Sequence, residues 1–160
     1  MNNRKTIVGL LAMMILVVAV VGSTQAALDV PVDIKPASCP NKLNVSARGV
    51  LPVAILGTAD FDTTSIDPAS VQLQGVAPLR WSWEDVATQY VPYSGKSDAY
   101  DCNEFGADGF MDLTFKFKTQ EVVTALGPVE DGEVLIIPLA GSLQDGTPFS
   151  GEDVLIIVKK

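Results

Sequence analysis

Residues 111–118, Met-Asp-Leu-Thr-Phe-Lys-Phe-Lys, carry the clearest strand pattern in the chain. Met111, Leu113, Phe115 and Phe117 occupy every second position, and polar or charged residues lie between them. Successive side chains of a β-strand point to opposite faces, so this alternation predicts a strand with one buried face and one solvated face. The segment is the starting point for predicting a β-protein.

Further short segments on both sides of it are also typical of strands. They are residues 28–35, 43–47, 50–56, 71–73, 79–83, 134–139 and 154–158. Turn signals such as Asp67-Pro68 and Asp131-Gly132 separate them, and the only predicted α-helix, residues 119–126, is too short to cover a parallel sheet. The sequence therefore predicts an all-β fold, an Ig-like or jelly-roll-type β-sandwich of seven to eight strands with one short helix.

Two details place particular strands within this sandwich. Pro31 lies inside the first predicted strand and has no backbone N–H to donate, which predicts an edge position for that strand. Trp81 and Trp83 fall on the same face as Leu79, which predicts that both indole rings fill the core.

Composition excludes several kinds of chemistry. The 160-residue chain contains no histidine, which removes Ser-His and Cys-His catalysis and most zinc sites. Its net charge of −8 argues against nucleic acid as a partner, because nucleic-acid binding needs a cationic surface. Glycosidases use a pair of carboxylic residues, which Asp98 and Asp101 could supply, but a small sandwich offers little room for a substrate cleft. We therefore expect no enzyme.

The N-terminal segment has the features of an export signal. Arg4 and Lys5 precede the uncharged run 7–21, and Thr24 and Ala26 stand at the −3 and −1 positions of a small-x-small cleavage site. The run is shorter than the roughly 20 residues of a bilayer span, although an uncleaved anchor is the alternative and would be the only membrane contact. The sequence predicts a signal peptide over residues 1–26 and one domain over 27–160, secreted or at the cell surface.

Cys39 and Cys102 are the two cysteines of the chain. In an exported protein an isolated pair is most simply a disulfide, and two thiolates without histidine make only half a zinc site. Closing a loop of roughly 60 residues stabilises a fold by about 4 kcal/mol in the chain-entropy description.

Several segments together resemble a module that recurs in secreted bacterial proteins. They are Val-Asp-Ile-Lys-Pro at 32–36, Pro40-Asn41, Gly-Val-Leu-Pro-Val-Ala-Ile-Leu at 49–56, Asp-Pro-Ala-Ser-Val at 67–71, Trp-Glu-Asp-Val at 83–86, Asp108-Gly109 through Phe117, and Thr-Gln-Glu at 119–121. The resemblance covers nearly the whole predicted mature chain. It implies a β-sandwich in an extracellular setting, often beside adhesive or dockerin-like domains, and implies no reaction.

The resemblance also implies an acidic loop of calcium-binding type. In similar modules Asp-x-Asn-Gly-Asp-Gly-x-x-Asp-Leu follows the tryptophan segment, and here Asp85, Asp108 and Asp112 match its first, middle and last acids. An insertion, residues 87–107, separates Asp85 from Asp108 and carries further oxygen donors. The candidate calcium ligands are Asp85, Asp101, Asn103, Glu104, Asp108 and Asp112. The alternative is a hairpin turn at Asp108-Gly109 with solvated acids around it.

The insertion contains Tyr90, Tyr93 and Tyr100, whose rings are a possible platform for sugars if they are exposed. Two functions of different class follow. The first is a secreted or cell-surface structural or adhesive module, with Ca²⁺ as the candidate stabilising ion and an extracellular protein or glycan as partner. The second is a carbohydrate-binding module that uses the aromatic side chains of the insertion.

Overall fold

The alternating segment at 113–118 forms β7 (Leu113–Lys118), an inner strand of a four-stranded antiparallel sheet. The computed structural model describes residues 26–160. In this sheet β2 (Val32–Ile34), β4 (Val50–Ile55), β7 and β6 (Arg80–Trp83) follow one another in that order. Val53 of β4 pairs with Phe115 of β7, and both side chains are fully buried. The alternation of Leu113, Phe115 and Phe117 is therefore the burial pattern of β7. Met111, which the same alternation placed on the buried face, lies before the strand and is 50% exposed, so that part of the prediction was wrong.

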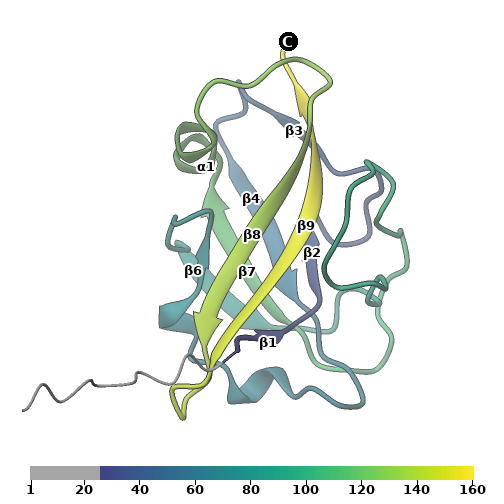
Figure 1. Ribbon diagram of the computed structural model, residues 1–160, viewed down its shortest axis with the longest axis vertical. Coiled ribbons are helices and arrows are strands. Elements are labelled where there is room, and N and C mark those ends of the chain that lie inside the picture. Colours follow the sequence, from purple (N-terminus) through teal and green to yellow (C-terminus); the bar gives the residue numbers. More distant parts are fainter. Residues whose placement is uncertain (1–25) are drawn as a thin grey trace, which may run out of the picture.

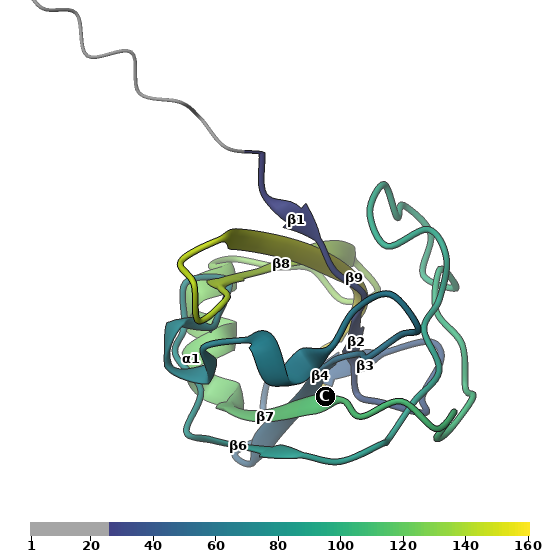
Figure 2. The same ribbon diagram turned by 90° about the horizontal axis from the view of Figure 1, so that it is seen from below.

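A second sheet packs over the first and completes the sandwich (Figure 2). It contains β1 (Leu28–Asp29), β9 (Pro148–Val158), β8 (Val134–Ser142) and β5 (Gln72–Leu73) in that order, and β3 (Lys42–Asn44) also pairs with β9. Phe117, Ile137, Leu139 and Leu155 meet between the two layers. The predicted all-β sandwich is confirmed.

Helical structure within residues 26–160 is limited to short elements. α1 (Thr119–Leu126) has the predicted bounds, and Gly127, with φ of 73°, follows its last turn. The 3₁₀ turns Thr63–Ser65 and Pro68–Ser70 begin at Asp62 and Asp67, whose carboxylates accept N–H groups of the first turn. No helix of the described chain is long and apolar enough to span a membrane.

The first predicted strand is divided in two by Pro31. β1 pairs with β9 in one sheet, whereas β2 pairs with β4 in the other, so the chain changes sheets at Val30–Pro31. Both pieces lie at sheet edges, as the proline predicted, but a single continuous strand over 28–35 was wrong. Residues 26–160 consequently contain nine strands rather than seven or eight.

The prediction that Trp81 and Trp83 fill the core was wrong. The two rings are 43% and 44% exposed, and every residue of β6 is exposed. Their cross-strand partners Phe115 and Leu113 are fully buried, so the tryptophan side chains lie on the inward-facing side of the sheet. β6 is the last strand of its sheet, and a strand in that position has a neighbour on one side only.

The insertion, residues 87–107, contains neither helix nor strand. It runs along the side of the sandwich formed by β2 and β9, opposite α1, as both views show (Figures 1 and 2). The predicted signal peptide lies outside the described residues, except for Ala26.

Candidate functional site

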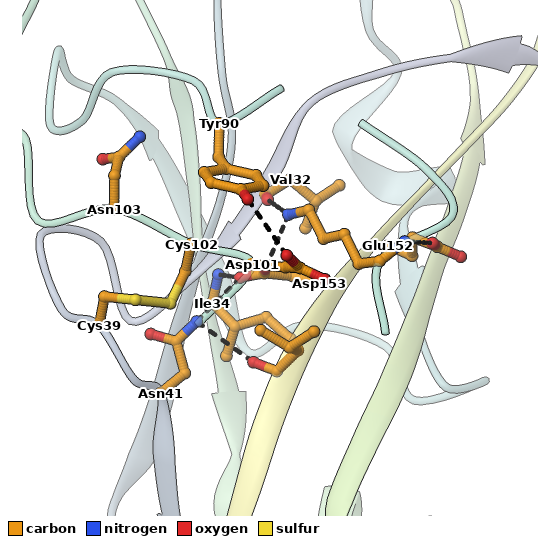
Figure 3. A network of polar contacts seen from close by, with 12 residues as sticks. Val32, Ile34, Cys39, Asn41, Tyr90, Asp101, Cys102, Asn103, Glu152 and Asp153 are labelled. Carbon is orange, nitrogen blue, oxygen red and sulfur yellow. Dashed lines mark hydrogen bonds and ion pairs between the residues drawn. A yellow bond between two sulfur atoms is a disulfide. The ribbon is translucent and has the colours of Figure 1, made fainter. Parts of the chain in front are cut away.

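A buried polar cluster lies where the insertion covers the edge between the two sheets. Asp153 of β9 is 1% exposed and projects from the second sheet toward β2 of the first. Its Oδ2 accepts hydrogen bonds from Ile34 N at 2.7 Å and from Asn41 Nδ2 at 3.0 Å (Figure 3). An N–H on the free edge of β2 therefore finds its acceptor in the neighbouring sheet.

The insertion supplies the cation of this cluster. Lys96 Nζ lies 2.7 Å from Asp153 Oδ1, and only 2% and 1% of the two side chains are exposed. The ammonium group also lies 3.5 Å from the Val32 carbonyl oxygen and 5.5 Å from the centre of the Tyr90 ring. Glu152 accepts the backbone N–H groups of Gly95 and Lys96, so the backbone of the insertion is attached to β9 at the residue that carries the ion pair.

Asp33 of β2 is a second buried carboxyl beside this pair. It is 8% exposed, and its Oδ1 has no hydrogen-bond partner within residues 26–160. Burial, reinforced by the negative charge of Asp153 and opposed by Lys96, raises the pKa of Asp33 to about 8. Burial likewise raises the pKa of Asp153, against the opposing effect of Lys96. At neutral pH Asp33 is therefore mainly a neutral acid.

A small cavity joins these groups. Its volume is about 10 Å³, about the space that a single water molecule needs. Its lining residues come from β2, the insertion and β9: Val32, Asp33, Thr88, Tyr90, Lys96, Cys102, Asn103 and Asp153. The cavity brings two carboxyls and one amine together and leaves no room for a substrate.

The predicted disulfide is confirmed. Cys39 and Cys102 are bonded, with a Cα–Cα distance of 5.6 Å and a sequence separation of 63 residues. The bond joins the loop after β2 to the last part of the insertion, next to the polar cluster (Figure 3). Cys102 also lines the small cavity beside Lys96, so the bond holds one wall of that cavity.

Three of the predicted calcium ligands fix the two ends of the insertion instead of facing one point. Asp85 accepts the backbone N–H groups of Asp108 and Gly109, which brings the beginning and the end of the excursion together. Asp108 itself accepts from Phe110 N. These carboxylates act as caps for backbone donors that have no partner in a strand.

Asp112 is fully buried and has a similar role. Its oxygens accept from Gly57 N at 2.9 Å, Val86 N at 2.8 Å and Ala87 N at 3.2 Å. Burial raises the pKa of Asp112, while these three donors act in the opposite direction. The side chain thereby attaches the start of the insertion to the end of β4.

The remaining predicted ligands lie within the insertion. Asp101 accepts from Ser97 N and Asp98 N, and these backbone donors hold the pKa of Asp101 below its usual value. Asn103 donates to the carbonyls of Thr88 and Gln89, and Glu104 is exposed. No three His, Cys, Asp or Glu side chains in the described part of the chain are placed to share an ion. Calcium binding stays a prediction, and thermal unfolding with calcium or chelator tests it.

The three tyrosines of the predicted sugar platform have different surroundings. Tyr90 is partly buried, lies against Lys96 and donates to Asp101 Oδ1 at 3.1 Å, which raises the pKa of the phenol. Tyr93 is half-buried, whereas Tyr100 is 67% exposed. Tyr90 therefore belongs to the polar cluster, and Tyr100 is the exposed one of the three.

The sequence reading missed Asp33, Lys96 and Asp153. The last strand was predicted to begin at residue 154, because Gly-Glu-Asp at 151–153 has the composition of a turn. Gly151, Asp153, Leu155 and Ile157 nevertheless alternate as one buried face of β9. A carboxylate in phase with an apolar face is a signal for a buried partner, which here is the lysine of the insertion.

Comparison with protein-family models, with curated proteins and with solved structures finds no match to this chain. The chemistry of the described residues is therefore the basis for assigning a function.

Proposed function

We propose that the mature chain is an exported, non-catalytic module that acts outside the cell or on its surface as a structural or adhesive unit. The observation that carries this proposal is the way the insertion is held on the sandwich. The Cys39–Cys102 disulfide, the buried Lys96–Asp153 pair and the Asp112 caps all immobilise it. Their common effect is to rigidify a surface loop, which suits a module that bears load or presents a surface.

The disulfide also supports the extracellular setting, because such bonds persist in oxidising compartments. The strongly acidic composition is compatible with a solvated exterior, with 19 acidic against 11 basic residues in the full chain. Lys96 and Asp153 are paired with each other, and the cavity beside them has a volume of only about 10 Å³, which supports a structural use of that cluster over binding of a small molecule.

Cell fractionation and surface binding test the proposal together. The full chain is produced in a bacterial host, and we expect a product that begins after Ala26 in the extracellular or surface fraction with no free thiol. The labelled product is then applied to intact bacterial cells. Loss of binding after protease treatment indicates a protein partner, and loss after periodate treatment indicates a glycan. A reduced, uncleaved chain in the cytosol would contradict the proposal.

A carbohydrate-binding module is the second candidate, and exposed aromatic residues favour it. Tyr100 and Phe105 of the insertion are both 67% exposed, and Trp81 and Trp83 form a separate exposed pair on β6. Flat rings on a rigid surface stack against the apolar faces of sugars. Retention on insoluble polysaccharides tests this function, with Tyr100→Ala/Phe105→Ala and Trp81→Ala/Trp83→Ala compared as matched pairs. Loss in only one pair identifies the surface, and no retention of the wild type excludes this candidate for those polysaccharides.

A further inference from the structure

We infer that Lys96 and Asp153 are the partners of an intramolecular isopeptide bond that joins the insertion covalently to β9. The amine nitrogen and the nearer carboxylate oxygen are 2.7 Å apart, and both side chains are almost completely buried. Nζ therefore lies at most one C–O bond length further from Asp153 Cγ than from Oδ1. This places an amine and a carboxyl carbon close together in a site that water hardly reaches.

The other oxygen of Asp153 is held as the carbonyl of such an amide would be. Ile34 N and Asn41 Nδ2 both donate to Oδ2, at 2.7 Å and 3.0 Å. When Nζ adds to Cγ, negative charge develops on Oδ2, and two fixed N–H donors stabilise that charge. Oδ1 faces Lys96 and is the oxygen that leaves.

Asp33 is the group placed to move protons for this reaction. It lines the same cavity as Lys96 and Asp153, and its buried Oδ1 is without a hydrogen-bond partner in the described chain. A neutral carboxyl can donate a proton to the departing oxygen and take one back from the attacking nitrogen. An acid that must stay neutral explains why a third ionisable group is buried beside an ion pair that is already complete.

The reaction balances without any oxidant, reductant or co-reactant. The ammonium of Lys96 and the carboxylate of Asp153 together carry no net charge. Nζ forms a bond to Cγ, the Cγ–Oδ1 bond breaks, and two of the three ammonium protons leave with Oδ1 as one water molecule. Asp33 gives one proton and recovers one, so it is unchanged.

Burial supplies the reason for the amide to be favoured over the ion pair. Each ion of a buried pair loses several kcal/mol of hydration, roughly, and the mutual attraction offsets this only in part. The amide is neutral, and it keeps the hydrogen bonds of Ile34 and Asn41 to Oδ2. Holding the two groups in contact also removes most of the entropic cost of joining them.

Mass spectrometry of the full chain, purified after export and then reduced and denatured, tests the inference. We expect an intact mass lower than the sequence of the isolated species by one water molecule. Trypsin cannot cleave after an acylated Lys96, so the digest should contain residues 81–116 joined to residues 119–159. Separate peptides 81–96, 97–116 and 119–159 from a folded, soluble chain would overturn the inference.

Matched variants separate the isopeptide from other losses of water. Asp108-Gly109, Asp131-Gly132 and Asp145-Gly146 can each lose water as a succinimide, so a loss located there and not in the branched peptide also overturns the inference. We expect Lys96→Met to keep its full mass. Asp153→Asn should reach the same final mass as the wild type through loss of ammonia. Asp33→Asn should fold, measured by circular dichroism, and remain unlinked; a fully linked Asp33→Asn chain would remove Asp33 from the reaction.

Discussion

The edge of the sandwich between β2 and β9 and the edge formed by β6 differ in what covers them. The first is sealed by the insertion, through a disulfide, a buried ion pair and a neutral acid. The second carries Trp81 and Trp83, whose rings remain 43% and 44% exposed. The sealed edge depends on Lys96 and Asp153 keeping each other as partners, because an unpaired buried charge is costly. The open edge is expected to contribute less to the free energy of unfolding, and part of each tryptophan side chain is exposed to solvent.

The largest difference between the edges is expected on removal of Lys96. Lys96→Met leaves the Asp153 carboxylate buried without its partner, whether that partner is held as an ion or through the amide inferred above, and we expect a loss of at least about 3–5 kcal/mol in the free energy of unfolding. Lys118→Met is the matched control, because the Lys118–Glu121 pair is about half exposed, and we expect it to cost less than about 1 kcal/mol. Urea unfolding measures both. Equal losses in the two variants would show that the buried Lys96–Asp153 pair contributes no more to the free energy of unfolding than an exposed pair does.

Removal of the disulfide is expected to cause the second-largest loss of stability. Replacing both cysteines, Cys39→Ser/Cys102→Ser, removes the constraint on a 63-residue separation, and a loss of about 2–4 kcal/mol is expected from urea unfolding. Chymotrypsin should also cut faster at Tyr100 and Phe105, because the last part of the insertion then loses its own covalent attachment. Unchanged cleavage in the double variant would mean that the Lys96–Asp153 link and the Asp112 caps suffice to hold the loop.

The pH dependence of stability tests the neutral acid of the sealed edge. The pKa of Asp33 is raised in the folded chain to about 8 from 3.8, so its contribution to stability is complete below 3.8 and is lost as pH rises through 8. Between these two pH values the folded chain holds one more proton, on Asp33, than the unfolded chain does. Stability should fall by roughly 2–3 kcal/mol between pH 5 and pH 7 from this group, at about 1.4 kcal/mol per unit.

The comparison that isolates this dependence is made in unlinked chains, Lys96→Met against Lys96→Met/Asp33→Asn, so that the covalent bond inferred above does not differ between them. The amide has nearly the same shape and does not titrate, so the variant should lose the slope that Asp33 contributes. Asp153 and Asp112 also have raised pKa values and remain in both proteins, which leaves a weaker dependence of the same sign. Denaturant unfolding across this pH range measures the slope of stability against pH in both proteins. Parallel curves would contradict the assignment of this pH dependence to Asp33.

The regular part of the fold could be predicted from the sequence because the signal is local. A period of two places each strand, Pro31 marks an edge, and the short helix keeps its predicted bounds. The disulfide followed from counting cysteines in a chain whose N-terminal segment predicts export. None of these inferences requires knowledge of which segments meet in space.

The sealed edge could not be predicted in this way, because its residues come from three distant segments. Asp33, Lys96 and Asp153 look like solvated charges when each is read in its own surroundings. Their burial results from an irregular loop folding over the sandwich, and no periodicity describes that loop. The prediction that the tryptophans fill the core was wrong for a different reason. Their alternation indicates the inward face correctly, but it does not show that β6 is the last strand of its sheet.

The smallest expected effect belongs to the open edge. Trp81 and Phe115 are cross-strand partners, yet one ring is 43% exposed and the other is fully buried. Phe115→Ala should cost about 3–5 kcal/mol through the cavity it leaves in the core. Trp81→Ala should cost less than about 1 kcal/mol, because much of its surface already contacts water. Urea unfolding of the two variants compares one cross-strand pair under identical conditions. A large loss for Trp81→Ala would mean that this edge is packed as firmly as the sealed one, and its rings would then be structural and unavailable to a partner.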